Sequence, residues 1–131
     1  MSISKGKGLK ILIVEDEEDI LLVYNDYFSS RGHDIVSTHL TAENVMPEFG
    51  EKFPDICIID YRLPGKRNGL DAAIDILKKF PSMPILFITA YEPLVREIKL
   101  NPLLENRKIS IMVKPVMLAE IEKTMMNLVN G

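Results

Sequence analysis

The sequence predicts an α/β fold in which five parallel strands alternate with helices that cover both faces of one sheet. Short runs rich in Ile, Val and Leu alternate with longer stretches of helical periodicity, which is the pattern of successive βα units. Three stretches, residues 11–14, 56–59 and 85–88, contain no polar residue, as is typical of central parallel strands. The length of 131 residues is that of one domain with a substantial buried core.

The same patterns place the individual elements. The expected strands are residues 9–14, 34–38, 55–59, 84–88 and 109–113, and the expected helices are residues 19–30, 41–49, 69–80, 93–100 and 117–129. The third of these helices has the clearest apolar face, because its apolar residues recur at i, i+3, i+4 and i+7 from Leu70. Gly32 and Pro81 stand where the first and third helices are expected to end.

The composition of the strands also predicts their order. The first, third and fourth runs are continuously apolar over residues 11–14, 56–59 and 85–88 and belong in the middle of the sheet, whereas the second and fifth contain polar residues that suit its edges. This favours a flavodoxin-like, doubly wound (βα)5 sandwich of three layers with strand order 2-1-3-4-5. Ligands of such sheets bind beyond the carboxyl ends of strands 1 and 3. Residues 9–130 are expected to form this single domain, and residues 1–8 a flexible tail.

The overall composition excludes several classes of protein. The content of 47% hydrophobic and 27% charged residues is that of an ordinary globular protein, and a net charge of −3 predicts neither nucleic-acid nor anionic membrane binding. The first apolar run is too short for a signal peptide or a membrane span, so a cytoplasmic location is expected. Cys57 is expected to be a buried free thiol, and His33 and His39 to be solvated rather than functional.

Acidic residues are crowded immediately after the first strand. Because the carboxyl ends of neighbouring parallel strands meet at one edge, Glu15 and Asp16 after strand 1 should converge with Asp60 after strand 3. Carboxylates held together repel one another unless a proton or a cation relieves them, and hard oxygen ligands suit Mg²⁺. The three acids at positions 17–19 are instead expected to favour the positive end of the first helix.

A hydroxyl and an ammonium are predicted at the same edge. Thr89 ends the fourth strand and Lys114 follows the fifth. An acid, a hydroxyl and an ammonium around a metal form a phosphoryl-transfer site, in which Asp60 attacks the phosphorus and the other groups bind its oxygens. The joint placement of these residues at four strand ends predicts this chemistry more strongly than any one of them.

These residues fall within motifs that identify a family. Residues 8–130 resemble the receiver domain of two-component response regulators through IVEDE (13–17), IIDYRLPG (58–65), NGL (68–70), ITA (88–90) and VKP (113–115). The resemblance implies that Asp60 accepts a phosphoryl group from a phosphohistidine on a sensor histidine kinase or a histidine phosphotransfer protein. It also implies that Thr89 is the switch hydroxyl, that Lys114 is the phosphate counter-ion, and that a cis peptide bond precedes Pro115.

The resemblance implies the ligands of a cation as well. Asp16, Asp60 and the backbone carbonyl of Arg62 are expected to bind Mg²⁺, and Glu15 is expected to assist through water. In the family, Arg62 and Tyr91 occupy positions that tune the lifetime of the acyl phosphate. The Arg62 guanidinium is expected to engage the acids or the phosphoryl group and Tyr91 to limit water access, although exposure of both to solvent is an open alternative.

The chain departs from the family at two places. Receivers usually carry an aromatic switch residue three positions before the lysine, and here that position is Ile111. The stretch from Thr89 to Lys114 is also longer than usual and contains Pro102, so the fourth helix is expected to be short or broken. Because this region commonly forms the dimer surface in the family, formation of a homodimer stays open.

The sequence therefore predicts a stand-alone receiver of a phosphorelay that signals to a downstream protein by conformational change. Its only catalysis would be its own phosphorylation and dephosphorylation, since an aspartyl phosphatase would need an acid where Arg62 stands. The alternative is a degenerate receiver that acts as a phosphorylation-independent interaction module, which the absence of the aromatic residue at Ile111 would suit. Whether the chain is one domain of a longer protein stays open.

Overall fold

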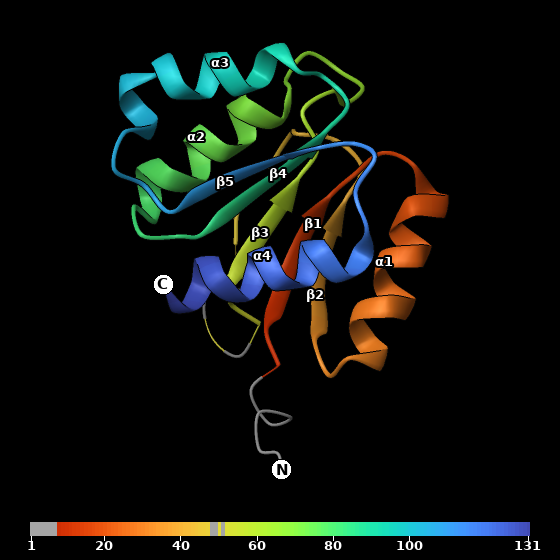
Figure 1. The fold of residues 1–131 in the computed structure, drawn as a ribbon. Coiled ribbons are helices and arrows are strands. Elements are labelled where there is room, and N and C mark those ends of the chain that lie inside the picture. Colours follow the sequence, from red (N-terminus) through yellow and green to blue (C-terminus); the bar gives the residue numbers. More distant parts are fainter. Residues whose placement is uncertain (1–7, 48–49, 51) are drawn as a thin grey trace.

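Five parallel strands form one sheet in the order β2-β1-β3-β4-β5 (Figure 1). A computed structural model describes residues 8–47, 50 and 52–131. The strands are β1 (Lys10–Val14), β2 (Asp34–His39), β3 (Ile56–Ile59), β4 (Ile85–Thr89) and β5 (Ile109–Val113). The helices are α1 (Glu18–Ser30), α2 (Gly69–Lys79), α3 (Pro93–Leu100), the 3₁₀ helix η2 (Pro102–Leu104) and α4 (Leu118–Asn130). The predicted flavodoxin-like fold class and strand order are confirmed.

Helices cover both faces of the sheet, and each face has its own apolar core. Alternate residues of a strand point to opposite faces. Ile11 and Ile13 therefore pack with residues of α1 and α4, whereas Leu12 and Val14 pack with residues of α2 and α3. The three central strands β1, β3 and β4 are buried along almost their whole length, which explains why their sequences are apolar except for Lys10 at the start of β1 and Thr89 at the end of β4.

The prediction of a helix at residues 41–49 is wrong for its described part. Residues 41–47 form turns and irregular backbone, and residues 48 and 49 lie outside the described residues. Asn44 has a left-handed φ of 58°, and Pro47 lacks the N–H that a helix needs while disfavouring helical backbone at Met46. Ala42 and Val45 are nevertheless buried in the core beneath α2. The apolar spacing thus reports burial of this segment and not its backbone conformation.

The expectation of a short fourth helix is confirmed. Helix α3 ends at Leu100, and Asn101 then accepts a hydrogen bond from the backbone N–H of Leu103 through its side chain at 2.9 Å. Pro102 begins η2, where its missing N–H is not needed. None of the helices in the described residues is long and apolar enough to cross a membrane.

The expectation that His33 is solvated is wrong, because this residue is part of the amino end of the sheet. His33 is buried, not solvated, and its Nδ1 accepts a hydrogen bond from the backbone N–H of Leu9 at 2.9 Å. Its Nε2 lies 2.8 Å from Oε2 of Glu122 on α4. The residue therefore joins the starts of β1 and β2 to a helix far along the chain.

Two further expectations concern the tail and the cysteine. Residues 1–7 of the predicted tail lie outside the described residues, but a side chain at Gly8 would collide with the backbone carbonyl of Gly32, so Gly8 packs against the domain. Cys57 is a buried free thiol as predicted, and burial raises the pKa of this thiol to about 12.

Candidate functional site

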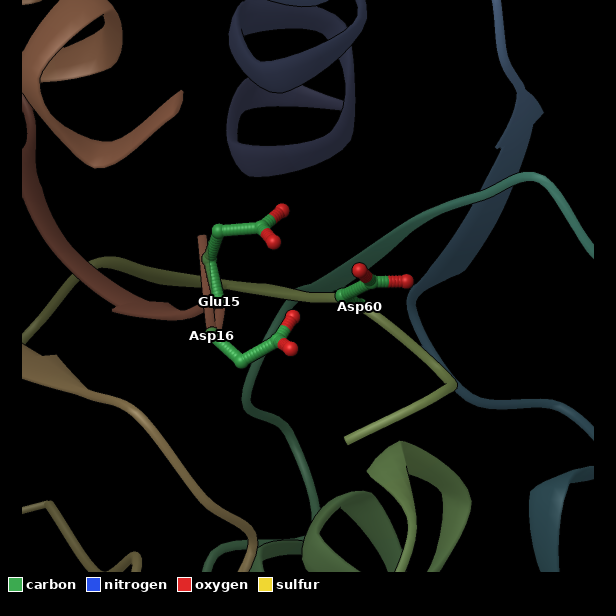
Figure 2. A group of neighbouring side chains, drawn as sticks. All are labelled: Glu15, Asp16 and Asp60. Atoms are coloured by element: carbon green, nitrogen blue, oxygen red, sulfur yellow. The ribbon is translucent and has the colours of Figure 1, made fainter. Parts of the chain in front are cut away.

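Three carboxylates meet beyond the carboxyl ends of β1 and β3. The strands run in register so that Val14 pairs with Ile59, and the backbone N–H of Asp60 donates to the Val14 carbonyl at 3.0 Å. Glu15, Asp16 and Asp60 consequently lie together, and one oxygen from each falls within 4.8 Å of the others (Figure 2). Strand register thus brings residues about 45 positions apart in sequence into one acidic cluster.

Lys114 lies beside two of these acids. Its backbone N–H donates to the carbonyl of Thr89 at 2.8 Å, which fixes it at the end of β5. Its Nζ lies 3.5 Å from Oδ2 of Asp60 and 3.6 Å from Oε1 of Glu15. The peptide bond between Lys114 and Pro115 is cis, as the resemblance implied. One ammonium therefore faces two buried carboxylates, which leaves an excess of negative charge.

Burial and mutual repulsion shift the titration of this cluster. Glu15 is only 2% exposed, and burial, reinforced by the charge of Asp60, raises the pKa of Glu15 to about 7. Burial also raises the pKa of Asp60, although the Lys114 ammonium and the backbone N–H of Tyr61 oppose this rise. Asp16 is exposed. The cluster is thus short of positive charge and open to solvent on one side.

The donor set fits a hydrated divalent cation. Three carboxylates offer hard oxygen ligands, and the exposure of Asp16 leaves space for the water molecules that Mg²⁺ retains. A cation would also offset the burial and the mutual repulsion that raise the pKa of Glu15 and Asp60. Among the described residues, this is the group of acids whose geometry could hold a metal ion.

The start of α2 approaches the acidic cluster closely. A side chain at Gly69 would collide with the backbone carbonyl of Asp60, and the Gly69 N–H donates to the Tyr61 carbonyl at 2.8 Å. Asn68 caps the helix by accepting from the backbone N–H of Asp71 at 2.9 Å. The Asn68-Gly69 motif therefore holds the loop that follows Asp60 against the end of β3.

Thr89 is connected to an aromatic pair. The buried Thr89 hydroxyl oxygen accepts a hydrogen bond from the backbone N–H of Tyr91 at 2.9 Å. The Tyr91 ring stacks on the Tyr61 ring with centroids 5.0 Å apart and planes 5° from parallel. The guanidinium carbon of Arg62 lies 4.5 Å from the centre of the Tyr91 ring. These contacts place Arg62 and Tyr91 together, and their predicted effect on acyl-phosphate lifetime stays a prediction.

Tyr61 was not predicted from the sequence to take part in the site. Tyr61 directly follows Asp60, and Tyr91 follows Thr89 by two residues. Because β3 and β4 are neighbours in the sheet, these positions could have indicated that the two tyrosines lie close together. Ile111 lies elsewhere, half-buried on β5 beside Phe87 and packed against the core beneath α2 and α3. Its aliphatic side chain has no polar group with which to join the site.

An apolar groove of about 500 Å³ opens next to Lys114. It runs between the first turns of α1 and the junction of β5 with α4, and its walls include Ile20, Val23 and Val116. Val23, which lines the groove from α1, is an exposed hydrophobic residue. The groove is therefore a surface on which another protein chain could rest beside the acidic cluster.

Known proteins share both the sequence pattern and the fold. Residues 11–125 match the family described as the response regulator receiver domain. The phyllosphere-induced regulator PhyR of Methylorubrum extorquens is 35% identical over 83 residues, which are 63% of this chain and 31% of that protein. The chain thus spans about a third of the length of this curated relative.

Two solved structures are similar over nearly the whole chain. The PhyR receiver domain of Erythrobacter litoralis has a TM-score of 0.74 and 29% identity, covering 94% of this chain and 91% of that one. The response regulator TrrA of Thermotoga maritima, solved in complex with Mg²⁺ and BeF, also has a TM-score of 0.74, with 26% identity and 91% and 97% coverage.

Proposed function

The chain belongs to the response regulator receiver domain family, and on this premise we propose that Asp60 accepts a phosphoryl group from a phosphohistidine on a partner protein. The observation that carries the proposal is the cluster of Asp60, Lys114 and Glu15 at one edge of the sheet, with Thr89 ending the next strand. The donor would be a sensor histidine kinase or a histidine phosphotransfer protein, and a downstream protein would receive the signal.

The transfer follows from the chemistry of these side chains. A carboxylate oxygen of Asp60 attacks the phosphorus, a P–O bond forms, and the P–N bond of the phosphohistidine breaks, leaving its electron pair on the imidazole nitrogen. Lys114 is within reach of the incoming phosphoryl oxygens because it already lies 3.5 Å from Asp60. Thr89 would donate its hydroxyl to one of them.

Mg²⁺ would neutralise negative charge on the transferring group when bound. Glu15, Asp16 and Asp60 are the side chains that would hold it, directly or through water, with the backbone carbonyl of Arg62 as a further ligand. The raised pKa of Glu15 supports this role, because a bound cation would replace the proton in compensating the negative charge of the acids.

The apolar groove beside Lys114 is suited to the phosphodonor. A histidine presented from a helix resting on α1 and the β5–α4 junction would reach Asp60 from the side on which Lys114 lies. We also propose that the protein works in the cytoplasm, as expected from the sequence, and that it acts on no external substrate.

Arg62 and Tyr91 would set the lifetime of the phosphorylated state together. The guanidinium rests on the Tyr91 ring, so removal of either side chain should disturb the other. We expect Arg62→Ala and Tyr91→Ala to change the acyl-phosphate half-life in the same direction. Unchanged half-lives in both variants would exclude the tuning role.

Intact-mass spectrometry tests the phosphoacceptor directly. The protein is incubated with Mg²⁺ and a small acyl-phosphate donor, beside an Asp60→Asn variant and a sample with EDTA. One phosphoryl adduct in the parent protein, lost in both controls, is the expected result. If the parent gives no adduct with this donor or with a phosphohistidine donor, the alternative function as a phosphorylation-independent interaction module is favoured, since Ile111 replaces the usual aromatic residue.

A further inference from the structure

Two stacked tyrosines connect the acidic cluster to the helices on one face of the sheet. Tyr61 follows Asp60 at the end of β3, and Tyr91 follows Thr89 by two residues at the end of β4. We call this pair the tyrosine stack. Its rings are 5.0 Å apart and nearly parallel, and the guanidinium of Arg62 lies against the Tyr91 ring.

The backbone of each tyrosine contacts a group that would take part in phosphoryl transfer. The N–H of Tyr91 donates to the Thr89 hydroxyl oxygen at 2.9 Å. The N–H of Tyr61 stabilises the Asp60 carboxylate. A change in the partners of Asp60 would therefore reach the backbone of Tyr61, and a change in the partners of Thr89 would reach that of Tyr91.

The tyrosine stack also contacts two helices. The side-chain amide of Asn68, the cap of α2, lies 3.3 Å from the Tyr61 hydroxyl and can donate to it. The carboxylate of Glu97 on α3 lies near the same hydroxyl and adds to the effect of burial in raising the pKa of Tyr61. The Tyr91 carbonyl accepts from the N–H of Leu94 in the first turn of α3 at 3.1 Å. The stack thus spans the distance between the acidic cluster and α3.

We propose that the tyrosine stack is the element that transmits phosphorylation of Asp60 to α3, taking the place of an aromatic residue at Ile111. The inference rests on the proposed function of Asp60. A phosphoryl group at Asp60 brings new oxygens that accept from Thr89 and compete for the Tyr61 N–H. Reorientation of the Thr89 hydroxyl shifts the Tyr91 backbone, so the rings slide and the first turn of α3 moves. Phosphorylation would then favour a second arrangement of two packed loops.

The test separates modification of Asp60 from the response of α3. Hydrogen exchange of the amides of α3 is measured with and without Mg²⁺ and beryllofluoride, an analogue of the phosphoryl group, in the parent, Tyr61→Leu and Tyr61→Phe proteins. Tyr61→Leu removes the ring, whereas Tyr61→Phe keeps the ring and removes only the hydroxyl. Adduct formation by intact mass and thermal unfolding are recorded for each protein.

We expect Tyr61→Leu to form the phosphoryl adduct but to lose most of the exchange response of α3, and Tyr61→Phe to restore that response. A stacked ring pair changes an equilibrium between two conformations by about 2- to 12-fold. We therefore expect the change in α3 exchange rates on adding beryllofluoride to be smaller by a factor of this size in Tyr61→Leu. A full response in a folded Tyr61→Leu protein would overturn the inference alone. Absence of an adduct in the parent protein would overturn the proposed function and this inference with it.

Fluorine NMR gives a second measurement on the intact protein. The chain has four tyrosines, and replacing them with 3-fluorotyrosine allows each resonance to be assigned by a Tyr→Phe variant. The resonances of Tyr61 and Tyr91 should shift together on addition of Mg²⁺ and beryllofluoride, while that of Tyr27 on α1 should not. Unmoved resonances of the pair in a protein that binds beryllofluoride would contradict the inference.

Discussion

Two clusters of polar groups, built around the buried His33 and around the buried Glu15 and Asp60, lie at opposite ends of the sheet. They differ in how well the hydrogen bonds and charges of their members are satisfied. At the amino end, His33 accepts from the Leu9 N–H and meets the Glu122 carboxylate, which also pairs with Arg31 at 3.0 Å. At the carboxyl end, Glu15, Asp16 and Asp60 lie together, and the Lys114 ammonium lies beside Glu15 and Asp60. The first cluster stabilises the fold, whereas the repulsion within the second is relieved when a proton or a cation compensates its negative charge.

Saturation with Mg²⁺ should increase the free energy of unfolding through the carboxyl-end cluster and not through the amino-end cluster. This is the largest effect that we expect. A ligand that binds only the folded state stabilises it by about 2.7 kcal/mol at 100 times its Kd. Denaturant unfolding of the parent protein should show an increase of this order, and the Asp60→Asn variant should show a much smaller one. Variants at His33 should retain the full increase, and its loss there would mean that the two ends of the sheet are coupled.

His33→Leu should destabilise the protein even without a cation. The change leaves the Leu9 N–H unpaired and takes a partner from Glu122, and an unsatisfied buried group costs about 1 to 3 kcal/mol. Urea unfolding at neutral pH measures the change in the free energy of unfolding. A neutral effect would show that water satisfies these groups and that the amino-end cluster contributes little.

Glu15→Gln, in contrast to His33→Leu, should stabilise the protein at high pH in buffer without divalent cations. The folded state holds the Glu15 proton more tightly than the unfolded state, so the associated stability is fully present below a pH of about 4.5 and is lost as the pH rises through about 7. The variant removes this loss and should exceed the parent in stability above neutral pH by on the order of 1 kcal/mol. Equal stability of the two proteins across this pH range would contradict the raised pKa.

Arg31→Ala should have the smallest effect. The ion pair with Glu122 involves an Arg31 side chain that is 56% exposed, and exposed pairs contribute only about 0.2 to 1 kcal/mol. The same urea measurement, repeated at high salt, should show the difference from the parent protein shrinking. A loss as large as that of His33→Leu would place the stability of the amino-end cluster in its charges instead of its buried hydrogen bonds.

Residue types and their order along the chain were enough to predict the strands, their arrangement and most of the candidate site. The wholly apolar runs identify the central strands, and parallel pairing forces the residues after those strands to one edge. Glu15, Asp60 and Lys114 could therefore be grouped from the sequence, and the distances of 3.6 and 3.5 Å from the Lys114 ammonium to the two acids confirm the grouping. The short α3 followed from Pro102 because proline has a strong local effect on backbone.

Three features depend on contacts between segments that are distant in the chain, so local pattern did not reveal them. The spacing of Ala42 and Val45 suits a helix, but the segment packs as irregular backbone around a left-handed Asn44. The partners of His33 are 24 and 89 residues away, and no periodicity indicates them. The tyrosine stack depends on how two loops rotate toward each other. Hydrophobic pattern reports which residues are buried, whereas tertiary packing decides which polar groups and rings meet.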